Sequence, residues 1–535
     1  MAQNLRVPQR DQVMLLPVDL REWLPEDDLV WHVLDVVEQL DLAAFYARYR
    51  INGQGAAAYD PAMMLALTIY AHAVGIKSSR MIERACTRDA GFKVVTGLLV
   101  PDHCTISRFV RTHQDALQGL FAQVLRLCHQ AGMVRLGVIA IDGTKIAANA
   151  SWAKSYTADA LAHQVAEEQA AFEALAAQLI EAQVAIDQAE DTEHGPDGGG
   201  RDDDLPPQLR RKAERLERIK KAKAQLDERD AAARQQMLDQ QAAKQAAYDA
   251  KAAAGDRPRG PRPKDEVGYG PPRRRGKDGT ITAPPPPRAS IIDPDSRRMK
   301  AKHGYVQGYN AQTATTTDQI IIGYRVSQNP TDHHELPDVL DTTTDVLHQA
   351  GITTAPADEH HDQQDTRPLT PSHEHQATPE QIEQIEQIEQ IEQIEQIEQD
   401  LKLAADRHDT LGVVLADAGY ANEETFTAVQ DRNLTLLAPL ASDEKLQQDT
   451  DPAGGQDLSE RPATDRGQRW LRTATGKALY KIRGRTAEPV FGQLKDRRGL
   501  RQFSTRGLDN VTTEFALGRT VHNIMKLFTH RPAPA

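Results

Sequence analysis

Cysteine is scarce in this sequence, with 3 among 535 residues. Cys86, Cys104 and Cys128 show neither paired CxxC spacing nor an even count, which argues against a zinc site and against a disulfide framework. No apolar run approaches the roughly 20 residues that a membrane-spanning helix needs, and the N-terminus lacks the apolar stretch of a secretory signal. We therefore expect a soluble cytoplasmic protein whose thiols are reduced and partly buried.

Positive charge is also in deficit overall, because the formal net charge is −13. This deficit is local, since residues 354–400 hold 13 acidic residues and one basic residue. By contrast, residues 461–535 carry a balance of +11 and residues 257–300 a balance of +7. Phosphate binding depends on the local electric field, so these two basic regions are compatible with a nucleic-acid partner despite the acidic total.

The chain is too long for a single hydrophobic core, so we expect two folded domains with insertions. Residues 14–130 carry apolar residues at helical spacing and should form an all-α N-terminal domain. One helix should begin at Asp60 and Pro61, a side-chain acceptor followed by proline at the first helical position. Its body, residues 62–74, is apolar nearly all round and belongs at the centre of the domain.

Two further helices of this domain, expected at 78–87 and 105–120, suggest a helix-turn-helix that binds DNA. In that arrangement the second helix would turn four polar residues toward DNA: Thr105, Ser107, Arg108 and Arg111. The alternative is an ordinary packed helix with a polar surface, which has the same pattern.

Three segments interrupt the second domain, which we place at 134–530. Residues 158–256 should form an antiparallel helical hairpin, because a Gly- and Pro-rich breaker divides them and apolar residues follow a heptad-like seam at Leu209, Leu216, Ile219 and Leu226. Residues 257–288 are a basic, Pro-rich linker. Residues 354–400 are an acidic, low-complexity insertion whose isoleucines recur every three residues and so form no common helix face.

Two aspartates follow apolar runs that are typical of buried strands. Asp142 follows residues 136–141, and Asp417 follows residues 411–416 and precedes a glycine turn. Paired strands at 304–306 and 320–326 would make the sheet mixed. Other carboxylates rank lower because they lie in a turn or a loop: Asp293, Asp295 and Asp332.

A third acidic residue, Glu488, directly precedes Pro489. Because proline is tolerated in the first turn of a helix, we expect Thr486 to be the N-cap and Glu488 to lie in that first turn, where the helix dipole favours a negative charge. The buried face would consist of Val490, Phe491 and Leu494. Lys495 follows seven residues later, within about 20° of Glu488 around the helix, and suits a phosphate contact.

Two carboxylates at strand ends and a third on a helix are suited to binding a pair of Mg²⁺ ions, because hard cations prefer oxygen ligands. Two such ions activate an attacking oxygen and stabilise the leaving oxygen of a phosphodiester. Mn²⁺ accepts similar ligands and should substitute. We expect Tyr480 and Arg483, which precede Glu488, to contact the DNA backbone or to orient the carboxylate.

Together these stretches resemble the DDE transposases of bacterial insertion sequences. The resemblance lies in IDGT around Asp142, ADAGY around Asp417, and a signature formed by Tyr480, Arg483, Glu488 and Lys495. Residues 14–115 resemble the family's N-terminal helical domain. The resemblance implies an α/β protein with an RNase H-like mixed-sheet catalytic domain, in which Asp142, Asp417 and Glu488 hold the metal ions and perform the catalysis.

The function that follows from this resemblance is transposition. We expect an enzyme that binds terminal inverted repeats in double-stranded DNA, cleaves their ends and joins the freed 3′-hydroxyl to target DNA. It would act as a homo-oligomer on DNA and associate with the bacterial nucleoid. The alternatives are a DNA-binding protein without catalysis and a nuclease of the same fold that performs no strand transfer.

Overall fold

The computed structural model describes residues 19–49, 57–194, 207–253, 274–275, 281–282, 287–301, 304–352, 399, 410–440 and 461–530. By their contacts, the parts of the chain fall into two compact units. Unit 1 comprises Met1–Ile146 and Asn310–Ala535, and unit 2 comprises Ala147–Tyr309. Nearly all of the acidic insertion at 354–400 and most of the linker at 257–288 lie outside the described residues. None of the described helices is long and apolar enough to cross a membrane.

The N-terminal part of unit 1 is helical, as predicted. Asp60 accepts a hydrogen bond from the Met63 amide at 3.3 Å and Pro61 occupies the first helical position, so the predicted helix start is confirmed. The helix that follows is buried nearly all round and contributes to a common core. The elements are η1 (Leu20–Glu22), α1 (Leu29–Glu38), α2 (Ala43–Tyr46), α3 (Pro61–Ala73), α4 (Ser79–Arg88), α5 (Ala90–Thr96), α6 (His103–Thr112) and α7 (Gln114–Gln130).

The predicted helix-turn-helix has a different structure. Helix α5 lies between α4 and α6 in the chain, and the single helix expected at 105–120 is divided at His113, whose backbone leaves the helical region. A helix-turn-helix joins its two helices by a turn of only about 3–4 residues, so the predicted motif is wrong in this form. Helices α4 and α6 nevertheless pack together, and Arg108 and Arg111 are exposed on α6.

The sheet is mixed, as the sequence predicted. Strand β9 (Val413–Leu415) pairs in parallel with β1 (Val138–Ala147) and with β10 (Thr435–Leu437). Strands β7 (Gly304–Thr316) and β8 (Ile321–Ser327) are antiparallel, and β6 (Arg297–Ala301) pairs with the first residues of β7. The path through the sheet is β10-β9-β1-β7-β6, with β8 also on β7.

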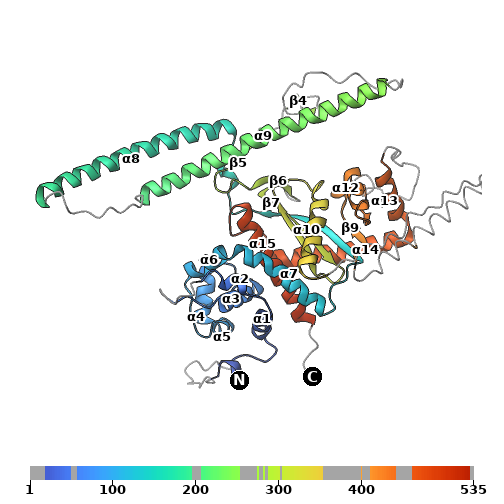
Figure 1. Cartoon of the computed structure of the whole chain (residues 1–535), viewed down its shortest axis with the longest axis horizontal. Helices are drawn as coiled ribbons and strands as arrows, with labels where there is room; N and C mark the ends of the chain where they lie inside the picture. The colour runs from blue at the N-terminus through green and yellow to red at the C-terminus, as the bar shows by residue number, and fades with distance from the viewer. Residues whose placement is uncertain are drawn as a thin grey trace, which may run out of the picture. The chain divides into compact units, whose positions relative to one another are not determined.

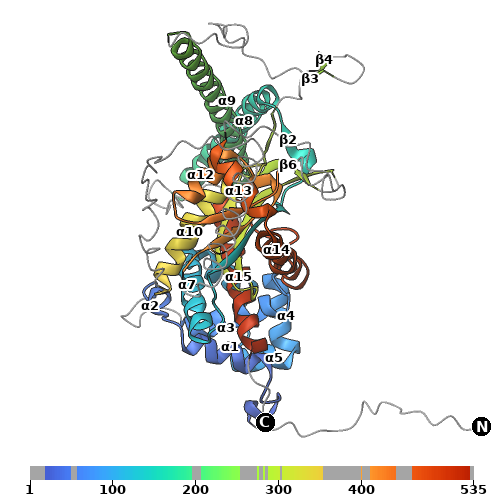
Figure 2. The ribbon, with the colours of Figure 1, turned by 90° about the vertical axis from the view of Figure 1, so that its right-hand side faces the viewer.

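Each face of the unit 1 sheet is covered by a different set of helices. Ile139, Ile141 and Val414 belong to the core shared with α10 (Glu335–Gln349), α7 and the N-terminal helices. Ala140 and Leu415 belong to a second core with α14 (Ala474–Gly492) and its neighbour α13 (Pro462–Arg472). Figure 2 shows α10 and α14 on opposite sides of the strands. Alternate residues of one strand therefore enter different cores, as the period of two requires.

The last helix, α15 (Leu508–His530), packs against the N-terminal helices of unit 1. It lies beside α7 in both ribbon views (Figures 1 and 2) and also packs on α3 and α1. Lys77, just before α4, forms an ion pair of 3.1 Å with the buried Glu514 of α15. The predicted modules at 14–130 and 134–530 thus share one core, and the assignment of DNA binding and catalysis to them stays a prediction.

Unit 2 consists mainly of the helical hairpin. Helices α8 (Ala158–His194) and α9 (Pro207–Ala253) lie side by side (Figure 1). The predicted apolar seam is confirmed, because its members are at most 6% exposed: Leu209, Leu216, Ile219 and Leu226. The middle of α9 lies beside a turn in which Asp293 accepts a hydrogen bond from the Tyr309 hydroxyl at 2.8 Å and Asp295 accepts one from the Gln225 amide at 2.5 Å. These two aspartates therefore have structural partners within unit 2.

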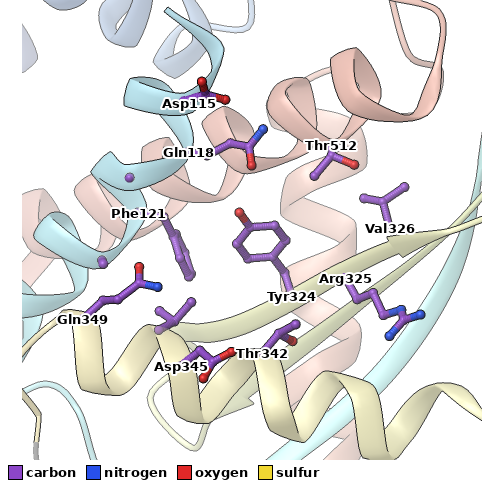
Figure 3. Close-up of a pocket in the computed structure, with 13 residues that line it drawn as sticks. Asp115, Gln118, Phe121, Tyr324, Arg325, Val326, Thr342, Asp345, Gln349 and Thr512 are labelled. Carbon is purple, nitrogen blue, oxygen red and sulfur yellow. The ribbon is translucent and has the colours of Figure 1, made fainter. Parts of the chain in front are cut away.

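A cavity of about 480 Å³ opens between α7, β8 and α10 of unit 1 (Figure 3). Phe121 and Tyr324 line it with their rings edge to face, 5.2 Å apart. The guanidinium of Arg519, which is fully buried, lies 3.0 Å from the centre of the Tyr324 ring, and burial lowers the pKa of Arg519 to about 9. Neither Asp142 nor Asp417 lines this cavity, so it is distinct from the site below.

Candidate active site

Parallel pairing brings Asp142 and Asp417 to the same level of the sheet. Ala140 lies opposite Leu415 in the register, so the two aspartates, each two residues further on, stand next to each other. Because side chains alternate, both point to the face that α14 covers. Asp417 directly follows β9 and caps the short helix η3 (Ala418–Tyr420) by accepting from the Gly419 amide. Strand β1 continues beyond Asp142 to Ala147, so the predicted strand end there is wrong.

Helix α14 places a cation between these two carboxylates. Its Arg483 Nη2 lies 3.3 Å from Asp142 Oδ1 and 3.9 Å from Asp417 Oδ2. Leu479 and Ala487, four residues before and after Arg483, pack against the sheet, so the helical period turns Arg483 the same way. The two aspartates from strands 275 residues apart in the sequence thus lie within reach of one guanidinium group.

Helix α14 does not begin where the sequence predicted. It starts at Ala474, where Thr473 Oγ1 accepts a hydrogen bond from the Gly476 amide at 2.9 Å. Thr486 is therefore not an N-cap, and Pro489 lies inside the helix. The proline is accommodated because the carbonyl of Arg485, which its missing N–H leaves without a helical donor, accepts from Gln319 Nε2 at 2.9 Å.

This helix start also moves Glu488 away from the predicted first turn. Glu488 lies near the end of α14 and is exposed. Five residues separate it from Arg483, which corresponds to about 140° around the helix. It still contributes to the pKa of Arg483, after Asp142, Tyr480 and Asp417. The structure therefore brings Asp142, Asp417 and Arg483 together and leaves Glu488 on the neighbouring helix surface.

Lys495 and Tyr480 lie near the same carboxylates. Lys495 belongs to a π-helical turn, Gln493–Arg497, and donates a hydrogen bond from Nζ to Thr144 Oγ1, two residues after Asp142. The π turn changes the helical step, so the predicted 20° relation to Glu488 does not apply. Tyr480 lies one turn before Arg483 and packs against the apolar core beneath α14. Val490, Phe491 and Leu494 are buried, as predicted.

Burial dominates the electrostatics of Asp142, whose side chain is 13% exposed. Burial raises the pKa of Asp142 to about 6, Arg483 opposes this shift, and the like charge of Asp417 adds to it. Arg483 has a raised pKa despite its own burial, because Asp142 and the other acidic neighbours favour its charged form. Two adjacent carboxylates repel each other when both are ionised, which favours a cation beside them.

Asp332 is the centre of a polar network, although its position in a loop gave it a lower rank than Asp142 and Asp417 in the sequence. Asp332 accepts hydrogen bonds from Lys145 Nζ at 2.8 Å, from Asn310 Nδ2 at 2.7 Å and from Gln312 Nε2 at 2.8 Å. The Tyr420 hydroxyl donates to Gln312 Oε1. The signal available in the sequence was the run of polar residues inside QGYNAQ, because polar side chains in a buried strand need partners.

Gly143 is required at its position by this network. A Cβ atom there would lie 2.3 Å from Gln312 Nε2, whose amide is fixed by its bonds to Asp332 and to Asn310 Oδ1 at 3.0 Å. Gly143→Ala should therefore displace the Gln312 amide and break these bonds.

We expect Gly143→Ala to lower the free energy of unfolding by about 1–3 kcal/mol, the cost of leaving a buried polar group unpaired. It should also lower the rate of any reaction at the adjacent aspartates at least about tenfold, as loss of outer-shell partners does. Thermal unfolding and an activity assay measure the two effects. Gly119→Ala in α7 is the control, because an added Cβ there meets nothing within 4 Å. Equal behaviour of the two variants would contradict the packing argument.

The donor set fits a divalent cation in part. Asp142 and Asp417 present oxygen ligands side by side, which suits Mg²⁺ or Mn²⁺. Among the described residues, however, no three Asp, Glu, His or Cys side chains are grouped closely enough to hold a metal. The observed geometry therefore provides two adjacent ligands, with Glu488 outside the group.

Two known protein families match this chain. A family model described as a transposase domain (DUF772) matches residues 18–112, which include α1 to α6. A second, described as a transposase DDE domain, matches residues 456–528, which include Arg483, Glu488 and Lys495. No curated protein and no solved structure matches the chain significantly. These two matches, to different parts of one sequence, support a DDE transposase of an insertion sequence.

Proposed function

We propose that this transposase binds the terminal inverted repeats of its element, cleaves DNA strands there in a metal-dependent reaction and joins the freed ends to target DNA. One observation supports this most directly: Asp142 and Asp417 stand together on neighbouring parallel strands with Arg483 within 4 Å of both. Ligand sites in open α/β sheets gather at the carboxyl ends of parallel strands. Asp417 directly follows β9, and Asp142 lies next to it within β1, just beyond the part of β1 that pairs in parallel with β9.

We also infer that the sheet is RNase H-like. The supporting feature is its connectivity: β1, β7 and β8 follow one another as neighbours, and β9 and β10 then add in parallel on the other side of β1. The aspartates of β1 and β9 thereby lie at the centre of the sheet. The helical hairpin enters between β1 and β7, and the acidic insertion between α10 and β9.

The proposed roles follow from position and charge. Asp142 and Asp417 would hold Mg²⁺ ions, with Glu488 as the third carboxylate, since it lies on the helix that carries Arg483. When bound, two such ions activate the attacking oxygen and stabilise the leaving oxygen of a phosphodiester. Arg483 and Lys495 would attract the DNA phosphate and hold it against the aspartates. Arg108 and Arg111, exposed on α6, and Tyr480 would contact the DNA backbone.

The proposal is tested with duplex oligonucleotides that carry the two ends of the element. In Mg²⁺ or Mn²⁺ the full-length protein should release a free 3′-hydroxyl at the repeat end and join it to a target plasmid. EDTA should abolish both steps, and a duplex with a scrambled end should not be cut. Cleavage without joining would favour the nuclease alternative, whereas specific binding without any cleavage would favour the DNA-binding alternative.

A further inference from the structure

A proline inside α14 leaves one backbone carbonyl dependent on a distant side chain. Pro489 has no N–H, so the carbonyl of Arg485, four residues earlier, lacks the donor that a helix normally provides. Gln319, from the turn between β7 and β8, supplies the missing donor through Nε2 at 2.9 Å. This side chain therefore replaces a helical hydrogen bond two residues after Arg483.

Gln319 is itself held by two other parts of unit 1, helix α15 and the π-helical turn that follows α14. Its backbone has φ +64°, the left-handed region that non-glycine residues seldom occupy. Its side-chain Oε1 accepts from Lys526 Nζ at 2.7 Å and from Gln493 Nε2 at 3.3 Å, and its carbonyl accepts from His522 Nε2 at 2.9 Å. A strained backbone that persists with this many partners indicates a position fixed by its surroundings.

The contact between Gln319 and Arg485 lies where a rotation of α14 would move Arg483 relative to Asp142 and Asp417. Arg483 reaches both aspartates from the same helix, and Ala487, two residues after Arg485, is fully buried against the sheet. The helix is weakest at the proline, because one bond of its ladder is missing there. A shift at that point would move the Arg483 guanidinium away from Asp142 or from Asp417.

We infer that Gln319 is a positioning residue for DNA cleavage, which acts by fixing the rotation of α14 at its proline so that Arg483 stays between Asp142 and Asp417. This inference rests on the proposed function. It assigns no contact with DNA to Gln319. The inference has a specific consequence: the effect of replacing Gln319 should depend on the residue at position 489. The donor from Gln319 is needed only where residue 489 lacks an N–H.

The test is a double-mutant cycle between Gln319→Glu and Pro489→Ala in the full-length protein. Gln319→Glu keeps the side-chain length and the acceptor for Lys526 and removes the donor to Arg485. In the wild-type background it should lower the single-turnover cleavage rate at saturating DNA about 10-fold or more, as loss of an outer-shell partner does. The dissociation constant for repeat DNA should change less than about twofold, because Gln319 is assigned no contact with DNA.

In the Pro489→Ala background the result should differ. Alanine restores the N–H that bonds the Arg485 carbonyl, so Gln319→Glu should then change the cleavage rate less than about twofold. Gln493→Ala is the matched control, because it removes the weaker partner of Gln319 and leaves the bond to Arg485; its cleavage rate should stay within about twofold of wild type. An equal loss from Gln319→Glu in both backgrounds would overturn the inference.

Thermal unfolding of the same four proteins separates this inference from the proposed function. Gln319→Glu should lower the unfolding midpoint more in the wild-type background than in the Pro489→Ala background, whether or not the protein cleaves DNA. If Gln319→Glu lowered the midpoint equally in both backgrounds, the contact between Gln319 and Arg485 would be overturned. If the two backgrounds differed as expected but the wild-type protein did not cleave DNA, the proposed function would be overturned and Gln319 would have only a structural role.

Discussion

Asp142→Ala and Asp417→Ala should each lower the rate of strand cleavage at least about 100-fold while binding of terminal-repeat DNA is not weakened. The lower bound follows from metal sites in which loss of an outer-shell partner alone costs about 10–100-fold. Each substitution removes a proposed metal ligand and leaves Arg483 with one of its two aspartate partners. Binding is spared because the phosphate contacts are assigned to the basic residues.

Cleavage and binding are measured on the same end-labelled duplex, in gel-based assays with and without Mg²⁺. Asp345→Ala provides the control, because Asp345 is an exposed aspartate of α10 on the other side of the sheet. Glu488→Ala tests the third proposed ligand and should behave like the two aspartate variants. If the Glu488→Ala protein kept the wild-type cleavage rate, Glu488 would be excluded as a metal ligand and only Asp142 and Asp417 would remain.

Glu514→Ala should destabilise unit 1 by about 3–5 kcal/mol, the cost of leaving one member of a buried ion pair without its partner. Glu514 is 6% exposed and accepts from Lys77 Nζ at 3.1 Å, from the Ser504 and Thr505 amides and from the Thr505 hydroxyl. Removing the carboxylate leaves Lys77 and these donors unsatisfied. The midpoint of thermal unfolding should fall by several degrees.

The pH dependence of stability gives a second measure of this ion pair. Lys77 and the hydrogen-bond donors hold the pKa of Glu514 below its ordinary value of 4.5, although burial acts in the opposite direction. The carboxylate therefore stabilises the folded state fully above about pH 4.5, and this contribution is lost as the pH falls through the lower folded-state pKa. Glu514→Gln keeps the shape and should remove this acid-dependent part. An unchanged midpoint in Glu514→Ala would contradict the pairing.

The strands and the main helices could be predicted because local patterns determine them. The buried runs before Asp142 and Asp417, the capped start of α3 and the seam of α9 all follow from the spacing of apolar residues. The adjacency of the two aspartates was also expected, and it arises from the parallel pairing of β1 with β9 although β1 continues beyond Asp142. What the sequence could not show is the register, which depends on pairing between segments 275 residues apart.

The error at Glu488 has a specific physical cause. A proline normally marks the first turn of a helix, because elsewhere it leaves a carbonyl without a donor. Here Gln319 supplies that donor from a turn 170 residues earlier in the chain, so the helix continues through Pro489. No local rule detects such a long-range partner. The same holds for Asp332, whose three hydrogen-bond donors come from β1 and β7.

The shared core of unit 1 also constrains how the protein is made. Residues of α1 and α3 pack against α15, and His32 is hydrogen-bonded to the carbonyl of Ile524 at 3.1 Å. The first helices to leave the ribosome must therefore wait for the last one, which at about 5–20 residues per second takes roughly 20 to 90 s. During that interval their apolar surfaces lack a partner from their own chain. A message that is truncated before α15 would consequently yield N-terminal helices without a complete core, and any fragment of this kind would depend on chaperones or be degraded.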